Sequence, residues 1–104
     1  VGGVVKNMKP GEAKKELEKE TLFIDIREDW ERERGYIPGS LWLPMSEISE
    51  RRDEIPEKKK AVIYCEHGVR SVYLLSFLKG MGFENLINLD GGFDAWKREG
   101  LPGE

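Results

Sequence analysis

Residues 61–71 read Ala-Val-Ile-Tyr-Cys-Glu-His-Gly-Val-Arg-Ser, and this stretch decides the fold. Its first four residues form a short, fully apolar run, which is typical of a strand that is buried on both faces. The segment from Ser71 to Met81 is apolar on nearly every side, which predicts a buried helix ending at Gly80 and Gly82. Cys65, the only cysteine of the chain, therefore lies where a buried strand turns into a buried helix.

The rest of the chain alternates short apolar runs with charged, amphipathic segments. We expect strands at residues 22–26, 41–43 and 86–89, and helices at residues 10–20, 28–34, 46–55 and 93–100. Val4-Val5 is a short apolar pair that could open the sheet. Strands that alternate with helices and are apolar on both faces indicate a parallel sheet with helices on each side. Such sheets bind ligands at the carboxyl ends of their strands, which selects the loop that begins at Cys65.

The composition fits one small domain spanning residues 1–104. The chain has a mass of 12.0 kDa, with 17 Lys and Arg, 20 Asp and Glu, and a net charge of −3. No apolar run approaches the roughly 20 residues of a membrane helix, and a slightly acidic domain is a poor nucleic-acid binder. No signal-peptide pattern is visible, so we expect a cytoplasmic protein. The Glu- and Lys-rich, Gln-free composition resembles that of thermophile proteins, although chance explains it equally well in so short a chain.

One cysteine and one histidine limit the possible sites. They exclude an intrachain disulfide, and they exclude a zinc site that lacks carboxylates or a second chain. A cysteine at a strand-to-helix turn faces backbone N–H groups and the positive end of a helix dipole, which favour the nucleophilic thiolate. A lone cysteine after a strand is more often a small buried apolar residue. The Gly, Arg and Ser that follow this one favour a reactive thiol, because Gly68 lets the loop curl and Arg70 adds a planar cation.

Four stretches, in order, resemble the single-domain rhodaneses, a family of sulfurtransferases. They are FIDIRE at residues 23–28, GYIPGS at 35–40, CEHGVRS at 65–71 and LDGGFDAW at 89–96, with Gly-Leu-Pro following at 100–102. The resemblance extends from about residue 5 to residue 102 and is specific as a combination. It implies an α/β, three-layer fold with a five-stranded, mostly parallel sheet and helices on both faces.

The resemblance also implies a sulfur-transfer reaction at Cys65. This catalytic cysteine would take a sulfane sulfur from an anionic donor such as thiosulfate and become a persulfide. A thiol, cyanide or a protein acceptor would then remove the outer sulfur. The substrate-binding residues would be those of the loop, whose backbone amides cradle the sulfur while Arg70 binds the donor: Glu66, His67, Gly68, Val69, Arg70 and Ser71. The resemblance implies no cofactor, no metal, and neither a nucleic acid nor a membrane as partner.

Three other functions would use the same cysteine. The domain could be a persulfide carrier or interaction module with little turnover on free thiosulfate. Related phosphatases and arsenate reductases place five residues between the cysteine and the arginine, whereas Cys65 and Arg70 are separated by four, a shorter loop sized for sulfur. A redox sensor that cycles through sulfenic acid would need a thiol from outside the chain.

Glu66 departs from the basic or neutral residue that several rhodaneses carry beside the cysteine. Its carboxylate should repel a dianionic donor and disfavour the thiolate of Cys65, unless it points into solvent. His67 is two residues from the cysteine, where a Cys–His pair would activate the thiolate. Because adjacent side chains of a curled loop usually point outward, we expect His67 to shape the mouth of the pocket.

The remaining motifs are expected to be structural. Asp25 and Arg27 alternate on one face of a strand end, where they could touch the active site, but a structural ion pair with Glu31 or Glu33 is the favoured interpretation. Residues 90–92, Asp-Gly-Gly, predict a turn into the last helix whose role is backbone geometry. The three tryptophans are expected to be packing anchors in the core: Trp30, Trp42 and Trp96.

Overall fold

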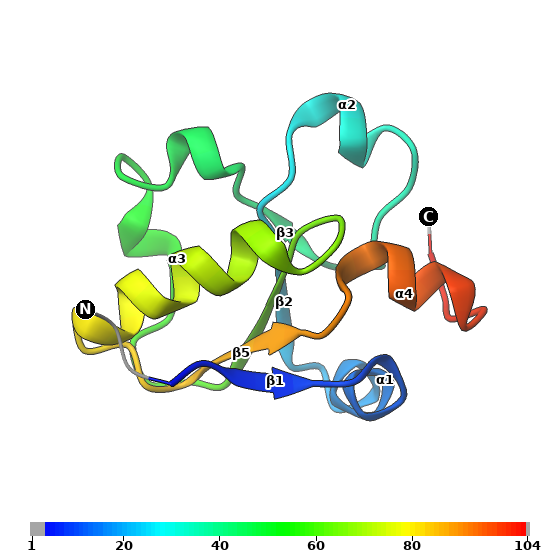
Figure 1. The fold of residues 1–104 in the computed structure, drawn as a ribbon, viewed down its shortest axis with the longest axis horizontal. Helices are drawn as coiled ribbons and strands as arrows, with labels where there is room; N and C mark the ends of the chain where they lie inside the picture. Colours follow the sequence, from blue (N-terminus) through cyan, green and yellow to red (C-terminus); the bar gives the residue numbers. More distant parts are fainter. Residues whose placement is uncertain (1–3, 104) are drawn as a thin grey trace.

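The structure is a computed structural model that describes residues 4–103, and within them five parallel strands form one sheet (Figure 1). The order across the sheet is β1-β5-β4-β2-β3. The strands are β1 (Lys6–Met8), β2 (Leu22–Asp25), β3 (Leu41–Trp42), β4 (Ala61–Tyr64) and β5 (Leu86–Leu89). The helices are α1 (Pro10–Glu18), α2 (Asp29–Arg32), α3 (Val69–Gly80) and α4 (Gly92–Arg98). The predicted five-stranded α/β fold is confirmed.

Two apolar layers lie on opposite faces of the sheet, α3 belonging to one and α1 and α4 to the other (Figure 1). Successive side chains of a strand point to opposite faces, so Val62 and Tyr64 of β4 belong to one layer and Ile63 to the other. Every residue of β4 is buried, as its apolar run predicts. Cys65 continues this alternation and lies in the layer of α3.

Residues 46–55 do not form the helix that the sequence predicts. Two short 3-10 turns, Met45–Glu47 and Arg52–Glu54, occupy this segment. Only Ile48 and Ile55 of the segment are buried. Since the polar residues between them supply no apolar stripe at helical spacing, packing does not stabilise a continuous helix.

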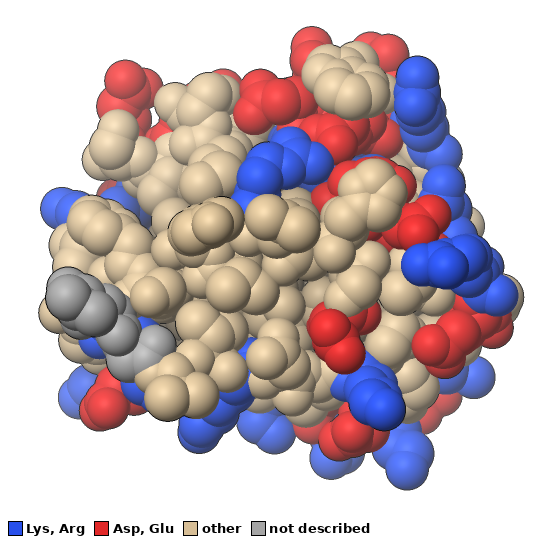
Figure 2. Space-filling view, in the orientation of Figure 1, with Lys and Arg blue, Asp and Glu red and all other residues tan. Residues whose placement is uncertain are grey.

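Helix α3 is less buried than its composition predicts. It begins at Val69, two residues before the expected start, and its inward face is buried through Leu74 and Leu78. Tyr73 and Phe77, by contrast, are 71% and 60% exposed, and Figure 2 shows the largely uncharged surface that α3 presents. The expectation of burial on most sides is wrong, because only one face of α3 meets the sheet. No helix among residues 4–103 is long and apolar enough to span a membrane.

The three tryptophans have different environments. Trp96 is fully buried, and its indole N–H donates to the carbonyl oxygen of Pro102. Trp42 is half-buried and donates to the carbonyl oxygen of Arg27 at 2.8 Å. Trp30 is 56% exposed, against expectation, because α2 stands at the carboxyl edge of the sheet and covers neither face (Figure 1).

The Tyr64 hydroxyl joins the central strand β4 to the loop between α2 and β3. It accepts a hydrogen bond from the N–H of Ile37 at 3.1 Å and shares another with the Ser40 hydroxyl at 3.0 Å. Burial is the main cause that raises the pKa of Tyr64 to about 12, so the hydroxyl keeps its proton at neutral pH.

We expect Tyr64→Phe to lower the free energy of unfolding by about 1–3 kcal/mol, because it leaves the buried N–H of Ile37 without its acceptor. Urea denaturation measures this difference. Tyr73→Phe removes the same hydroxyl from an exposed position of α3 and should change the stability by less than about 0.5 kcal/mol. Equal losses in the two variants would contradict a structural role for the Tyr64 hydroxyl.

Candidate active site

Cys65 lies at the carboxyl end of the central strand β4 and is 1% exposed. Its sulfur accepts a hydrogen bond from the backbone N–H of Gly68 at 3.1 Å and lies 3.3 Å from the hydroxyl of Ser71. The Ser71 hydroxyl donates to the side-chain oxygen of Asn88, whose amide donates to the side chain of Asn7. Because the hydroxyl proton is directed at Asn88, the Ser71 oxygen is free to accept the proton of the Cys65 thiol.

The loop between β4 and α3 bends back over the cysteine. Gly68 has a left-handed φ of +88° and is the N-cap of α3, and its N–H contacts the sulfur of Cys65. Since α3 begins at Val69, the N–H groups of its first turn have no carbonyl partner within the helix. These N–H groups and the helix dipole favour an anion at the position of the sulfur.

The N-terminus of α4 holds the loop from the other side. The carbonyl oxygens of Cys65 and Glu66 accept hydrogen bonds from the N–H groups of Phe93 and Asp94, each at 2.9 Å. Gly92, with a φ of +65°, lies so close that a Cβ there would be 2.5 Å from the Cys65 carbonyl oxygen. The predicted Asp-Gly-Gly turn therefore has a specific role, because a glycine lets α4 approach the backbone of the loop that begins at Cys65.

Glu66 does not point into solvent. Its carboxylate accepts a hydrogen bond from the guanidinium of Arg27 at 3.0 Å, and 21% of its side chain is exposed. Arg27 is buried and also pairs with Asp25 at 2.9 Å. Burial lowers the pKa of Arg27, but its hydrogen bond with Asp25 and further contacts with carboxylates outweigh this effect and raise the pKa. The charge of Glu66 is therefore balanced by a permanent cation.

The expected ion pair of Arg27 with Glu31 or Glu33 is wrong. Glu31 offers Arg27 only its backbone carbonyl oxygen, at 3.2 Å. The Glu31 carboxylate instead binds both terminal nitrogens of Arg70, at 2.9 and 2.6 Å. This hydrogen bond with Arg70 is the main cause that lowers the pKa of Glu31. Any anion that binds the guanidinium of Arg70 must therefore compete with Glu31.

A hollow of about 320 Å³ lies beside the Cys65 loop. It is lined by Arg27, Trp30, Glu31, Arg34, Glu66, His67 and Lys97. His67 is exposed at its mouth, as the sequence predicts. A larger hollow, of about 420 Å³, is formed around the 3-10 turns of residues 45–55 and contains no residue of the loop, so the smaller one is the candidate substrate site.

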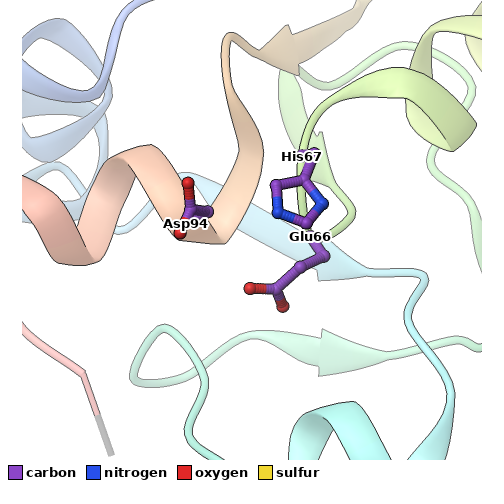
Figure 3. Close-up of side chains that lie close together, drawn as sticks. All are labelled: Glu66, His67 and Asp94. Carbon is purple, nitrogen blue, oxygen red and sulfur yellow. The ribbon is translucent and has the colours of Figure 1, made fainter.

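Glu66, His67 and Asp94 converge beside the loop (Figure 3). One ligand atom from each lies within 4.8 Å of the others, and imidazole and carboxylate groups are ligands that zinc and iron accept. Both carboxylates already have partners, because Glu66 binds Arg27 and Asp94 binds Arg98 at 2.8 Å. A divalent cation at this cluster would have to compete with these guanidinium groups.

The predicted site residues fall into three groups. Gly68 and Ser71 contact the sulfur of Cys65, whereas Glu66 and His67 line the adjacent hollow. Arg70 binds Glu31, which lines the hollow, and Val69, with 61% of its surface exposed, contributes its backbone to the first turn of α3. Sequence reasoning missed the residues that α2 and α4 bring to the same hollow, which are Trp30, Glu31, Arg34 and Lys97.

Several known proteins are similar to this chain in sequence and in fold. A model of the Rhodanese-like domain matches residues 9–99. A protein of Allochromatium vinosum named Sulfurtransferase is 43% identical over 83 residues, which cover 80% of this chain and 78% of that protein. The Thiosulfate sulfurtransferase GlpE of Coxiella burnetii is 29% identical over 79 residues, or 76% of this chain and 74% of that protein. The structure of a rhodanese-related protein from Thermoplasma volcanium has a TM-score of 0.87 and 29% identity, and the match covers 95% of this chain and 97% of that one.

We expect Gly92→Ala to displace the Cys65 loop, because the new methyl group would lie 2.5 Å from a backbone oxygen at a φ of +65°. The free energy of unfolding should fall by about 2–4 kcal/mol, and a thiol reagent should modify Cys65 faster. Gly100→Ala is the matched control, since its φ is +71° and no atom lies within 4 Å of the added group. It should lose about 1 kcal/mol and keep the wild-type rate of modification. Similar behaviour of the two variants would argue against the close contact.

Proposed function

The chain belongs to the rhodanese-like domain family, and on this basis we propose that it is a sulfurtransferase that carries sulfur as a persulfide on Cys65. The observation that carries the proposal is the surroundings of the sulfur. The Cys65 sulfur accepts a hydrogen bond from the backbone N–H of Gly68 at 3.1 Å and lies at the N-terminus of α3. This arrangement stabilises negative charge on the sulfur. The names of the relatives, which include a thiosulfate sulfurtransferase, support thiosulfate as a donor.

The first half-reaction loads the cysteine. The Cys65 thiolate attacks the outer sulfur of thiosulfate, the bond between the two sulfurs of the donor breaks, and sulfite leaves with the bonding electron pair. The persulfide retains one negative charge, now on its outer sulfur. Backbone N–H groups of the loop and of the first turn of α3 stabilise that charge without reorganising, because the fold holds them in place.

The second half-reaction returns the enzyme to its starting state. A nucleophilic acceptor attacks the outer sulfur of the persulfide, and Cys65 leaves as a thiolate. Cyanide becomes thiocyanate, and a thiolate becomes a new persulfide. Neither half-reaction consumes an oxidant or a reductant beyond the donor and the acceptor. In both, Arg70 attracts the anionic substrate after releasing part of its contact with Glu31.

Cys65→Ser is expected to abolish loading. After incubation with thiosulfate, the intact mass of the wild-type protein should show one added sulfur atom, which cyanide removes. Because the chain has a single cysteine, the variant should show no adduct. An adduct on Cys65→Ser would refute the assignment of Cys65 as the sulfur carrier. A wild-type protein that takes no sulfur from several sulfane donors would refute the proposed sulfurtransferase activity.

Glu66→Gln removes the negative charge beside the cysteine and keeps an oxygen that can accept from Arg27. We expect the KM for thiosulfate to fall about three- to tenfold at low ionic strength, because the variant removes one of the carboxylates that balance Arg27, and the excess positive charge attracts a dianionic donor. The difference should shrink at high salt, where the charges are screened. Glu12→Gln makes the same charge change on the exposed surface of α1 and should leave the KM unaltered. An unchanged KM for Glu66→Gln at low salt would contradict a role of the Glu66 charge in donor binding.

A further inference from the structure

The residues that α3 exposes are all uncharged, which is unusual in so charged a chain. Charged residues make up 36% of the sequence, yet α3 contains only two, one near each end. Arg70 is bound to Glu31 at 2.6 Å, and the ammonium of Lys79 donates to the carbonyl oxygen of Val4 at 2.8 Å. The exposed residues of α3 and its C-cap form the surface that Figure 2 shows: Val69, Val72, Tyr73, Phe77, Gly80 and Met81.

This surface consists of two neighbouring rows of side chains, each with a spacing of four residues. Such rows form the ridges of a helix surface. The large-residue row contains Val69, Tyr73, Phe77 and Met81, and the small-residue row contains Val72, Ser76 and Gly80. Because side chains become smaller along the second row, it leaves a groove beside the ridge that the first row makes.

A helix face with a ridge beside a groove is complementary to a copy of itself. The large-residue row of one molecule fits over the small-residue row of a second, and the second molecule returns the same contact. This reciprocity is what a two-fold symmetric interface requires. Rows with a spacing of four residues pack in this way when two helices cross at about 50°, the commonest arrangement in globular proteins.

The charge of the molecule also favours contact at this face. Each copy has a net charge of −3, so two copies repel each other wherever their acidic surfaces meet. The surface of α3 brings no carboxylate of its own into such a contact, since the helix contains neither Asp nor Glu.

The area of the face fits a weak dimer. Tyr73 and Phe77 leave 71% and 60% of their surfaces exposed. Aromatic side chains bury about 150–250 Å² each, so the whole face offers roughly 500 Å², which is within the range of the largest apolar patches on monomers. Two faces together would bury about 1,000 Å², the lower end for a specific interface between proteins.

We propose that α3 is a dimerisation surface whose partner is α3 of a second copy of this chain. Phe77 of each molecule packs against Ser76 and Gly80 of the other, and Tyr73 packs against Val72 and Ser76. The dimer is independent of the sulfur chemistry proposed for Cys65, because its formation involves no substrate.

Sedimentation velocity of the full chain tests the dimer between about 1 and 100 µM protein, the range in which a small interface should dissociate. The average mass should rise from 12.0 kDa towards twice that value. Phe77→Ala should raise the dissociation constant at least tenfold or about that, because it removes the central ridge residue from both copies.

Ser76→Phe distinguishes a fitted interface from general apolar association. The new ring adds apolar surface but fills the groove, so the dissociation constant should rise about tenfold or more. Trp30→Ala is the matched control, since it removes an exposed aromatic ring from α2 and should change the dissociation constant less than about twofold. All variants should keep the wild-type urea midpoint at about 1 µM, where the monomer dominates, because none of these positions is buried.

Four results would overturn the dimer. The wild-type protein could remain at 12.0 kDa at the highest concentration, or its mass could grow beyond twice that value without a limit. Ser76→Phe could strengthen the association, which would indicate apolar adhesion without a fitted groove. Trp30→Ala could weaken the association as much as Phe77→Ala, which would place the contact outside α3.

Discussion

The buried guanidinium of Arg27 is the interaction on which the rest of the site depends. It donates to the carboxylates of Asp25 and Glu66 and to the backbone oxygens of Glu31 and Gly35. A buried cation is strongly destabilising unless its donors are satisfied, so each of these partners is held in place relative to the end of β2. Through Glu66 this constraint reaches the loop that begins at Cys65, and through Glu31 it reaches α2, which in turn holds Arg70.

The same network determines which charges the site presents to a substrate. Because Arg27 and Arg70 neutralise Glu66 and Glu31, the acidic residues of the hollow contribute little field of their own. Among residues 4–103, Arg34 and Lys97 line the hollow without a carboxylate partner within 4.0 Å, and these two cations then decide its sign. A protein with a net charge of −3 can therefore attract anions locally, since the potential in a recess depends on nearby groups more than on the total charge.

The sequence predicts the strands and helices around the cysteine well, because the patterns that indicate them lie close together in the chain. The apolar run of β4, the following glycine and the helix after it lie side by side in the chain, so the cysteine loop can be located without tertiary information. Residues 46–55 were harder, because their two buried isoleucines are seven positions apart and compatible with several short turns. The ion pairs could not be predicted from the sequence. Glu66 and Arg70 each find a partner 39 residues away, and several arginines and glutamates compete for those roles.

Position and charge at Cys65 are controlled by different parts of the molecule. The sulfur is positioned by neutral contacts: the N–H of Gly68, the hydroxyl of Ser71 backed by Asn88, and the N-terminus of α4 that Gly92 brings close. The charge around it is set by side chains that do not contact the sulfur, above all the ion pairs Arg27–Glu66 and Arg70–Glu31. Substitutions in the charged set can therefore change which ligands bind while the surroundings of the sulfur keep their geometry. Substitutions in the neutral set affect any reaction of Cys65, because they move the sulfur itself.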